Sequence, residues 1–187
     1  LGIDEFRRLV KEERDALAPD ERWSAYVDQL PTQGEQPLHV GAALEDAPDT
    51  GALQTWLKTN VYRQRQPGYV VATITLPLGD LSGQQLRRLA DLARRFVGDA
   101  VRTTVEQNIV LRWVREADLP ELHRELEAIG LAQPGAGTIA DITACPGTDT
   151  CKLGIASSRG LAAELERRLH EQMSGLDEAV RRLRIKV

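Results

Sequence analysis

The sequence predicts an α+β fold in which two helices cover one face of a small sheet, and two observations carry this prediction. Strand-like runs rich in apolar and β-branched residues begin at Tyr69 and at Asn108. Apolar residues also recur at helical spacing near residues 83–97 and again near 118–129. With two shorter strand-like runs, the order becomes strand, helix, strand, strand, helix, strand. This order is the split βαβ, or ferredoxin-like, arrangement, which names a fold and implies no activity.

The first predicted strand and the helix after it are the most regular part of the chain. Tyr69–Leu76 is apolar and β-branched, and Pro77 should end it. Ser82 should cap the helix over 83–97, and Gly98 should help to close it. The residues expected on the core side of these two elements are Val70, Ala72, Ile74, Leu76, Leu86, Leu89, Ala90, Ala93, Phe96 and Val97.

Three further strands and a second helix complete the predicted layer. Strands are expected over Ala100–Thr104 and Asn108–Val114, and a short run over Thr138–Thr143 should return to the sheet. Pro120 lies in the first turn of the second helix, which Gly130 should end. The residues expected on the core side of this part are Ile109, Leu111, Trp113, Leu119, Leu122, Leu126 and Ile129.

The segments on either side differ from this layer. Residues 1–56 hold two helical patterns and then, from Pro31, a stretch dense in proline and glycine, so they are predicted to form a helical connector and an irregular linker. The last third is predicted to hold a helix up to Gln172 and a shorter one over Leu176–Leu183, after which Arg184–Val187 is strand-like. The apolar side of the longer helix should carry Ile155, Ser158, Leu161, Ala162, Leu165 and Leu169.

Composition excludes several classes of protein. The 187 residues are 42% hydrophobic and 28% charged, with a net charge of −4. This composition is typical of a globular domain and argues against general binding to nucleic acid. No stretch is long and apolar enough for a membrane helix, and the first residues lack the pattern of a signal peptide, so a cytoplasmic protein without a membrane partner is expected.

Charge is unevenly distributed along the chain. Residues 57–114 hold nine basic residues against four acidic ones, whereas residues 1–56 hold five against twelve. A basic middle is what a site for anions needs, although arginines at a solvated surface explain it equally well. The candidate anion-binding residues are Arg63, Arg65, Arg102 and Arg112.

Two cysteines carry the strongest chemical signal. Five residues separate Cys145 from Cys151, with Pro-Gly after the first cysteine and a predicted helix beginning at the second, where a helix N-terminus would favour a thiolate. Taken alone, such a pair is also compatible with two small buried residues. A closed zinc site or an iron–sulfur cluster needs four ligands. His39, His123 and His170 are scattered singly and are expected to be ordinary surface or half-buried residues.

Three motifs in order carry a resemblance to a known family. They are Asn60–Tyr69, the Arg-x-Thr-x-x-Gln-Asn pattern within Val101–Leu111, and the Cys-x5-Cys pattern of residues 144–151. Together they resemble the second of two pseudo-symmetric halves of the sirohaem-dependent nitrite and sulfite reductases. The resemblance implies a ferredoxin-like half-domain over 57–137, followed over 138–187 by the truncated start of a domain for sirohaem and a [4Fe–4S] cluster.

The resemblance also implies roles for particular residues. Cys145 and Cys151 would be cluster ligands, and Arg102, Thr104, Gln107 and Asn108 would line the cofactor pocket by hydrogen bonding to sirohaem or to the cluster loop. The implied activity is the six-electron reduction of nitrite to ammonia or of sulfite to sulfide. Ferredoxin or a flavoprotein would donate the electrons, and the remaining half of the same polypeptide would complete the site.

The chain also departs from the family pattern. The second cysteine pair, Cys-x3-Cys, which carries the thiolate shared with sirohaem, is not in the sequence, nor are the substrate-binding lysines of the first half. Because the chain begins without Met and ends on a strand-like run, a fragment of a longer protein is expected. With two of the four thiolates, this fragment should be inactive and hold no cofactor. Two alternatives stay open: a freestanding ferredoxin-like binding module with incidental cysteines, and a half-subunit that another chain completes.

Overall fold

The computed structural model describes residues 2–29, 36–45, 51–98, 101–172 and 175–187. The chain divides into two compact units, Leu1–Glu35 and Gln36–Val187, and each is described by itself. Among the described residues, no helix is both long and apolar enough to cross a membrane.

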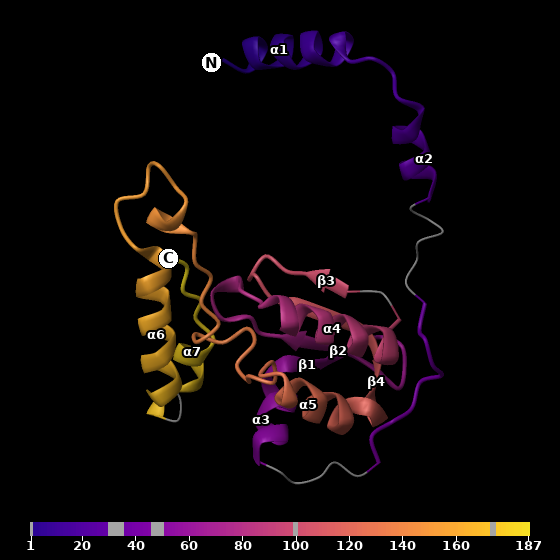
Figure 1. Ribbon diagram of the computed structural model, residues 1–187, viewed down its shortest axis with the longest axis vertical. Helices are drawn as coiled ribbons and strands as arrows, with labels where there is room; N and C mark the ends of the chain where they lie inside the picture. The colour runs from indigo at the N-terminus through magenta and orange to yellow at the C-terminus, as the bar shows by residue number, and fades with distance from the viewer. Residues whose placement is uncertain (1, 30–35, 46–50, 99–100, 173–174) are drawn as a thin grey trace. The chain divides into compact units, whose positions relative to one another are not determined.

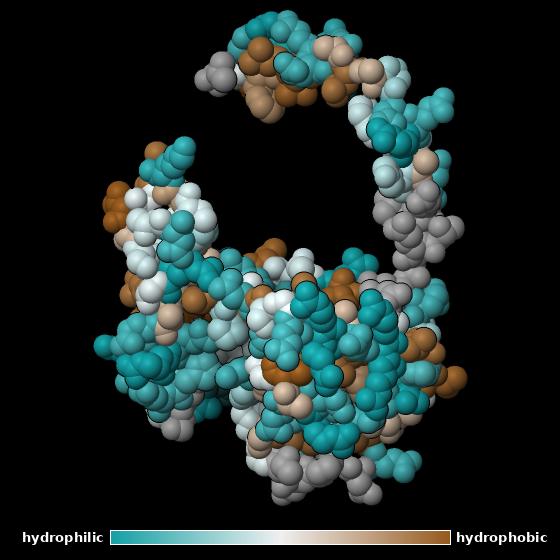
Figure 2. All heavy atoms as spheres, viewed as in Figure 1, coloured by the Kyte–Doolittle hydropathy of each residue, from teal (hydrophilic) through white to brown (hydrophobic). Residues whose placement is uncertain are grey.

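The N-terminal unit holds the two helices that the sequence predicted, α1 (Ile3–Ala16) and α2 (Glu21–Gln29). None of the α1 side chains is buried, and hydrophobic ones gather on one side of this helix, the uppermost element in Figure 2. The predicted helix stop at Pro31 lies outside the described residues. Residues 36–45, which belong to the larger unit, form neither helix nor strand.

The larger unit is built around a sheet of four short strands. They are β1 (Val61–Arg63), β2 (Tyr69–Ile74), β3 (Val101–Thr103) and β4 (Ile109–Arg115). Their order is β1-β2-β4-β3, and every pair of neighbours is antiparallel. The predictions for the strands that form β2, β3 and β4 are confirmed, although residue 100 lies outside the described part.

The fourth strand is not the one that the sequence predicted. Thr138–Thr143 stays outside the sheet, and β1 occupies the edge beside β2. The amide of Gln64 donates to the carbonyl of Tyr69 at 3.1 Å, and Gly68 takes a φ of 78°, so a local hairpin brings β1 to β2. The prediction of Thr138–Thr143 as the fourth strand is therefore wrong, and β1, which precedes β2, is the fourth strand instead.

A bulge in β4 changes which side chains face the core. The register pairs Ala72 with Leu111 but Val70 with Val114, so that two residues of β4 oppose one residue of β2. Trp113 has a φ of 63°, and its amide donates to Oε1 of Gln64 at 2.8 Å. The prediction that Trp113 continues the core face is therefore wrong, and Val114 is buried in its place.

Helices α4 (Gly83–Phe96) and α5 (Leu119–Ala128) pack side by side over one face of the sheet, as predicted (Figure 1). Ser82 caps α4 with a capping box that includes Gln85. Leu86 is an exception to the predicted core because it is 55% exposed; burial along α4 begins at Leu89. Ile129 is only partly buried against the core. The buried residues of this core include Val70, Ala72, Ile74, Leu89, Phe96, Ile109, Leu111, Leu122 and Leu126.

Part of the segment that the sequence assigned to the connector packs into this core. Helix α3 (Gly51–Asn60) buries Leu53 and Trp56 in the same cluster as the sheet. The buried side chain of Asn60 then donates to the carbonyls of Thr73 and Gln133, at 2.9 and 3.0 Å. In the structure, the residues that support the sheet thus begin before the expected boundary at 57.

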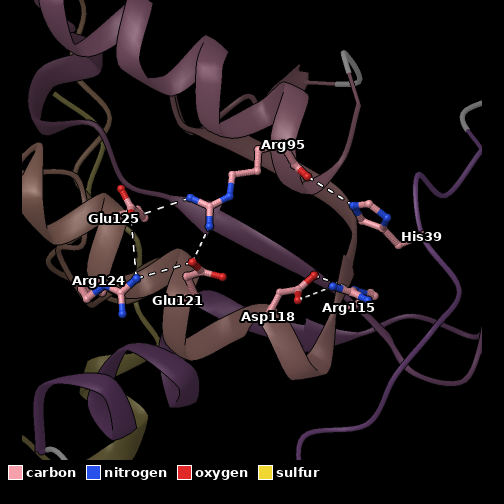
Figure 3. A network of polar contacts seen from close by, with 7 residues as sticks. All are labelled: His39, Arg95, Arg115, Asp118, Glu121, Arg124 and Glu125. Carbon is pink, nitrogen blue, oxygen red and sulfur yellow. Dashed lines mark hydrogen bonds and ion pairs between the residues drawn. The ribbon is translucent and has the colours of Figure 1, made fainter.

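Charged side chains join the outer faces of α4 and α5 (Figure 3). Arg95 of α4 pairs with Glu121 and Glu125 of α5, and Arg124 approaches the same two carboxylates. Between β4 and α5 lies one 3-10 turn, η2 (Glu116–Asp118), which is held by the Arg115–Asp118 ion pair at 2.7 Å. The exposed pairs of Arg95 and Arg124 add little stability individually and mainly fix which faces of α4 and α5 meet.

The C-terminal part forms a second, smaller core. It holds η3 (Gly147–Asp149), α6 (Ser158–Gln172) and α7 (Glu178–Arg181). The amide of Thr143 donates to the carbonyl of Ile185 at 3.2 Å, and the amide of Val187 donates to the carbonyl of Thr143 at 2.9 Å. The two strand-like runs of this region therefore pair with each other, in parallel, rather than with the sheet. The small core consists of Ile142, Ala144 and Ala162, with Leu78, Leu165, Leu169, Ile185 and Val187 partly buried against it.

The predicted apolar side of α6 needs one correction. Ile155 is fully exposed and precedes the helix, which begins at Ser158, and Leu161 is 54% exposed. Residues 151–157 are not helical, so Ile155 cannot belong to the apolar side of α6.

Candidate functional site

The loop that carries Cys145 and Cys151 is braced by its own backbone. The amide of Cys151 donates to the carbonyl of Gly147 at 2.9 Å, and the amide of Gly154 donates to the carbonyl of Cys151 at 3.0 Å. A Cβ atom at Gly147, which has a φ of 55°, would lie 2.8 Å from the amide nitrogen of Ser158. At Gly154 it would lie 2.9 Å from that of Thr148. The loop therefore requires glycine at both positions.

The two thiols lie in different surroundings, although both are exposed and free. Sγ of Cys145 is 3.3 Å from Oγ of Ser158, the first residue of α6. The Ser158 hydroxyl, and next the backbone N–H of Gly147, hold the pKa of the Cys145 thiol below its usual range. The prediction that a helix begins at Cys151 is wrong, because η3 precedes this cysteine and α6 begins later; the helix start lies beside Cys145.

Two of the four predicted pocket residues, Gln107 and Asn108, bond to the segment that leads into this loop. Gln107 uses both ends of its carboxamide on Ala144: Nε2 donates to the carbonyl at 2.9 Å, and Oε1 accepts from the amide at 3.1 Å. Asn108, which is 2% exposed, donates to both carboxylate oxygens of Asp141 at 2.9 and 3.0 Å. Oγ1 of Thr104 accepts from the amide of Asn108 at 3.3 Å and so shapes the turn. Arg102 is exposed on β3.

The four candidate anion-binding arginines do not converge. Arg63 lies on β1 and Arg102 on β3, which are the two outer strands of the sheet. Three strand spacings separate them, about 14 Å. Arg63 approaches Glu116 at 3.8 Å, and the guanidinium of Arg112 lies 6.0 Å from the centre of the Trp113 ring. A single small anion therefore cannot contact the whole set.

Sequence reasoning missed Arg159, which ties the cysteine loop to the half-domain. Nε of Arg159 lies 3.2 Å from the Asp149 carboxylate, and Nη1 donates to the carbonyl of Leu78 at 3.4 Å. Nη2 of Arg159 pairs with the carboxylate of Asp80, which directly follows η1 (Pro77–Gly79). The only signal in the sequence was an isolated arginine in a small-residue stretch after the second cysteine.

The donor set for a metal is incomplete within the described residues. They contain no group of three or more Cys, His, Asp or Glu side chains that could hold a metal ion. His39 and His170 are exposed, whereas His123 is buried, more so than predicted, against the ring of Trp56. Two exposed thiols are half of the ligands that a [4Fe–4S] cluster requires, so the residues present fit part of such a site.

Comparisons with known proteins agree with this geometry. Residues 62–129 match the family model described as "Nitrite/Sulfite reductase ferredoxin-like half domain". A sulfite reductase [ferredoxin] of Mycolicibacterium paratuberculosis is 38% identical over 103 residues, 53% of this chain and 19% of that protein. An assimilatory ferredoxin-dependent nitrite reductase of Haloferax mediterranei is 35% identical over 109 residues, 50% of this chain and 19% of that protein.

A solved structure gives the same result. The NirA protein of Mycobacterium tuberculosis superposes with a TM-score of 0.53 and 30% identity, over 68% of this chain and 24% of that one. The chain spans about a fifth of the length of these curated relatives (19%). With the antiparallel sheet and its two covering helices, these matches assign residues 62–129 to the nitrite/sulfite reductase family, as a ferredoxin-like half-domain.

Proposed function

We propose that this chain is part of a longer sirohaem-dependent reductase that converts nitrite to ammonia or sulfite to sulfide. It would supply the second half-domain and, in Cys145 and Cys151, two of the four ligands of a [4Fe–4S] cluster. The observation that carries the proposal is the paired hydrogen bonding of Gln107 to Ala144. This contact joins two of the motifs on which the resemblance depends, and it places the half-domain directly beneath the first cysteine.

The surroundings of the thiols support a site that is completed from outside this chain. Leu153 and Ile155, which follow Cys151, are 91% and 100% exposed. Figure 2 shows hydrophobic side chains at the surface of this end of the larger unit, where the loop near η3 protrudes in Figure 1. Apolar side chains at this exposure favour a covering surface. In the parent, that surface would come from the remaining polypeptide and the cofactors.

The C-terminal strand-like run indicates where further ligands would enter. The amide of Cys145 donates to the carbonyl of Val187 at 2.9 Å. In a longer parent, a Cys-x3-Cys pair soon after this run would therefore start beside Cys145. When bound, the cluster and sirohaem would supply electrons one at a time to the substrate. The role of this chain's residues is to hold two thiolates and to orient their loop.

The remaining parts of the proposal rest on the resemblance and on the names of the relatives. Arg102, Thr104 and Asn108 would form part of the wall of the cofactor pocket. Ferredoxin or a flavoprotein would donate electrons, in the cytoplasm, without a nucleic-acid or membrane partner. The alternatives of a freestanding binding module or a half-subunit completed by another chain predict a different iron content, and the following experiment separates them.

The test is the iron and acid-labile sulfide content of the full-length parent, with its visible absorbance. Cys145→Ser and Cys151→Ser should each remove the cluster and all six-electron reduction, because a serine hydroxyl is a poor ligand for iron. Thr150→Ser, a change at an exposed neighbour of Cys151, is the matched control and should retain both. Iron and activity at the wild-type level in Cys145→Ser would refute the cluster assignment and favour the binding module.

A further inference from the structure

Gln107 takes a backbone conformation that its turn alone does not favour. It lies between β3 and β4 in a turn closed by the amide of Thr104 on the carbonyl of Asn108, at 2.9 Å. Its φ is 65°, in the left-handed region that glycine and asparagine tolerate better than other residues. A glutamine at this position therefore calls for a reason in its side chain.

The side chain has a specific task at Ala144. The carboxamide both donates to and accepts from the main chain of this one residue, which reproduces the paired bonds of neighbouring strands. Only a neutral amide provides a donor and an acceptor in this geometry, since a carboxylate only accepts. Ala144 is 3% exposed and directly precedes Cys145, so the position of Gln107 determines where the first cysteine begins.

A second tie holds the same segment from the adjacent position. Oδ1 of Asn108 accepts from the amide of Leu76 at 2.9 Å, while its Nδ2 holds Asp141. The Asp141 carboxylate in turn accepts from the amide of Gly137 at 2.7 Å. The anchor beneath Gln107 is thus buried and fully bonded, so that Gln107 acts from a fixed base.

The end of the loop near Cys151 is also bonded to the half-domain. Arg159, whose side chain is only 26% exposed, contacts Asp149, which lies two residues before Cys151. It also reaches the half-domain at Asp80 and at the carbonyl of Leu78. Each cysteine is therefore linked to the half-domain through a neighbouring residue rather than through its own side chain.

We propose that Gln107 is a positioning residue that sets the place of the Cys145 thiol through Ala144. The inference rests on the proposed function, because the proposed cluster site needs its two thiols held at a fixed separation. Arg159 performs the corresponding task for Cys151 from the other side of the loop. The half-domain thereby serves as the rigid base of the ligand loop.

The test compares Gln107→Leu with Gln107→Glu and a matched control. Leucine removes both bonds at similar size, and glutamate keeps the acceptor but loses the donor. The control is Gln85→Leu, far from the loop in sequence, which likewise removes one donated bond, from Nε2 to the carbonyl of Ile129 at 3.1 Å, and one accepted bond, from the amide of Ser82 at 3.1 Å. In this chain without metal, Gln107→Leu should speed hydrogen exchange at the amides of Ala144 and Cys145 about tenfold, with a smaller effect for glutamate. Gln85→Leu should leave these two amides unchanged.

The second readout is the cluster of the full-length protein loaded with iron and sulfide. Gln107→Leu should shift its midpoint reduction potential and its electron paramagnetic resonance spectrum per bound cluster, whereas Gln85→Leu should not. If Gln107 were merely structural, Gln107→Leu would lower stability and iron content but leave the potential and the spectrum of the retained clusters unchanged, and that result would overturn the inference. An unchanged hydrogen-exchange rate at the Cys145 amide in Gln107→Leu would overturn it as well. Wild-type protein without iron would overturn the proposed function and this inference together, so the two failures are distinguishable.

Discussion

At the scale of single residues, His123 makes the stability of the half-domain depend on pH. Its ring is 7% exposed and meets the Trp56 ring edge-on, with the centroids 5.2 Å apart. Burial lowers its pKa, and nearby Glu127 opposes this effect only in part. The unfolded chain, in which this side chain has an ordinary pKa, therefore binds the proton at a higher pH than the folded chain. The free energy of unfolding should fall as the pH drops below about 6.5.

Urea unfolding between about pH 7.5 and pH 5.5 checks this expectation. His123→Phe keeps an aromatic ring against Trp56 but cannot bind a proton, so its unfolding free energy should fall less over this range than that of the wild type. His39→Phe changes an exposed histidine and should follow the wild type. A His123→Phe curve parallel to the wild-type curve would show that His123 contributes nothing to the pH dependence.

The candidate site shows which residues sequence reasoning can find and which it cannot. Cys145 and Cys151 stand out because thiols are rare in this chain, and Gln107 and Asn108 stand out because they belong to a motif. The pairing of Cys145 with Ser158 was not predictable, because it depends on how closely Gly147 lets two backbone segments approach. Arg159 was not predictable either, because one of its partners, Asp80, lies 79 residues away in the sequence, while the other, Asp149, lies nearby.

At the scale of elements, the packing of α4 and α5 on the sheet gives a quantitative test. Leu89 of α4 and Leu126 of α5 are 2% and 0% exposed in one core. Truncation of either side chain to alanine should lower the free energy of unfolding by roughly 2–5 kcal/mol, because apolar contacts are lost and a cavity remains. Leu86→Ala, on the exposed first turn of the same helix, should cost no more than about 0.5 kcal/mol. Equal losses for Leu86 and Leu89 in urea unfolding would contradict the observed burial.

The elements that could be predicted are those whose pattern extends over several turns or pairs. Tyr69–Leu76 and the α4 region carry long, regular apolar patterns, and both form as expected. β1 has only three residues, whereas Thr138–Thr143 is a longer run that contains β-branched residues, so local pattern favoured the segment that does not join the sheet. A rule of strict alternation cannot predict the bulge at Trp113 either, because the Trp113 amide donates a hydrogen bond to the side chain of Gln64, which follows β1.

At the scale of the whole molecule, the ligand count limits what this chain can do alone. The described residues offer two exposed thiols and no cluster of three or more metal-binding side chains. The chain spans 19% of the length of the two curated relatives described above.

Because half a coordination shell leaves iron open to water and oxidant, the 187-residue chain reconstituted with iron and sulfide should lose its colour and iron on gel filtration. The full-length parent, treated identically, should retain about four irons per chain. If the 187-residue protein instead stays brown and elutes at twice its expected mass, two copies must combine their thiols. The missing ligands would then come from a second copy of this chain rather than from the parent polypeptide.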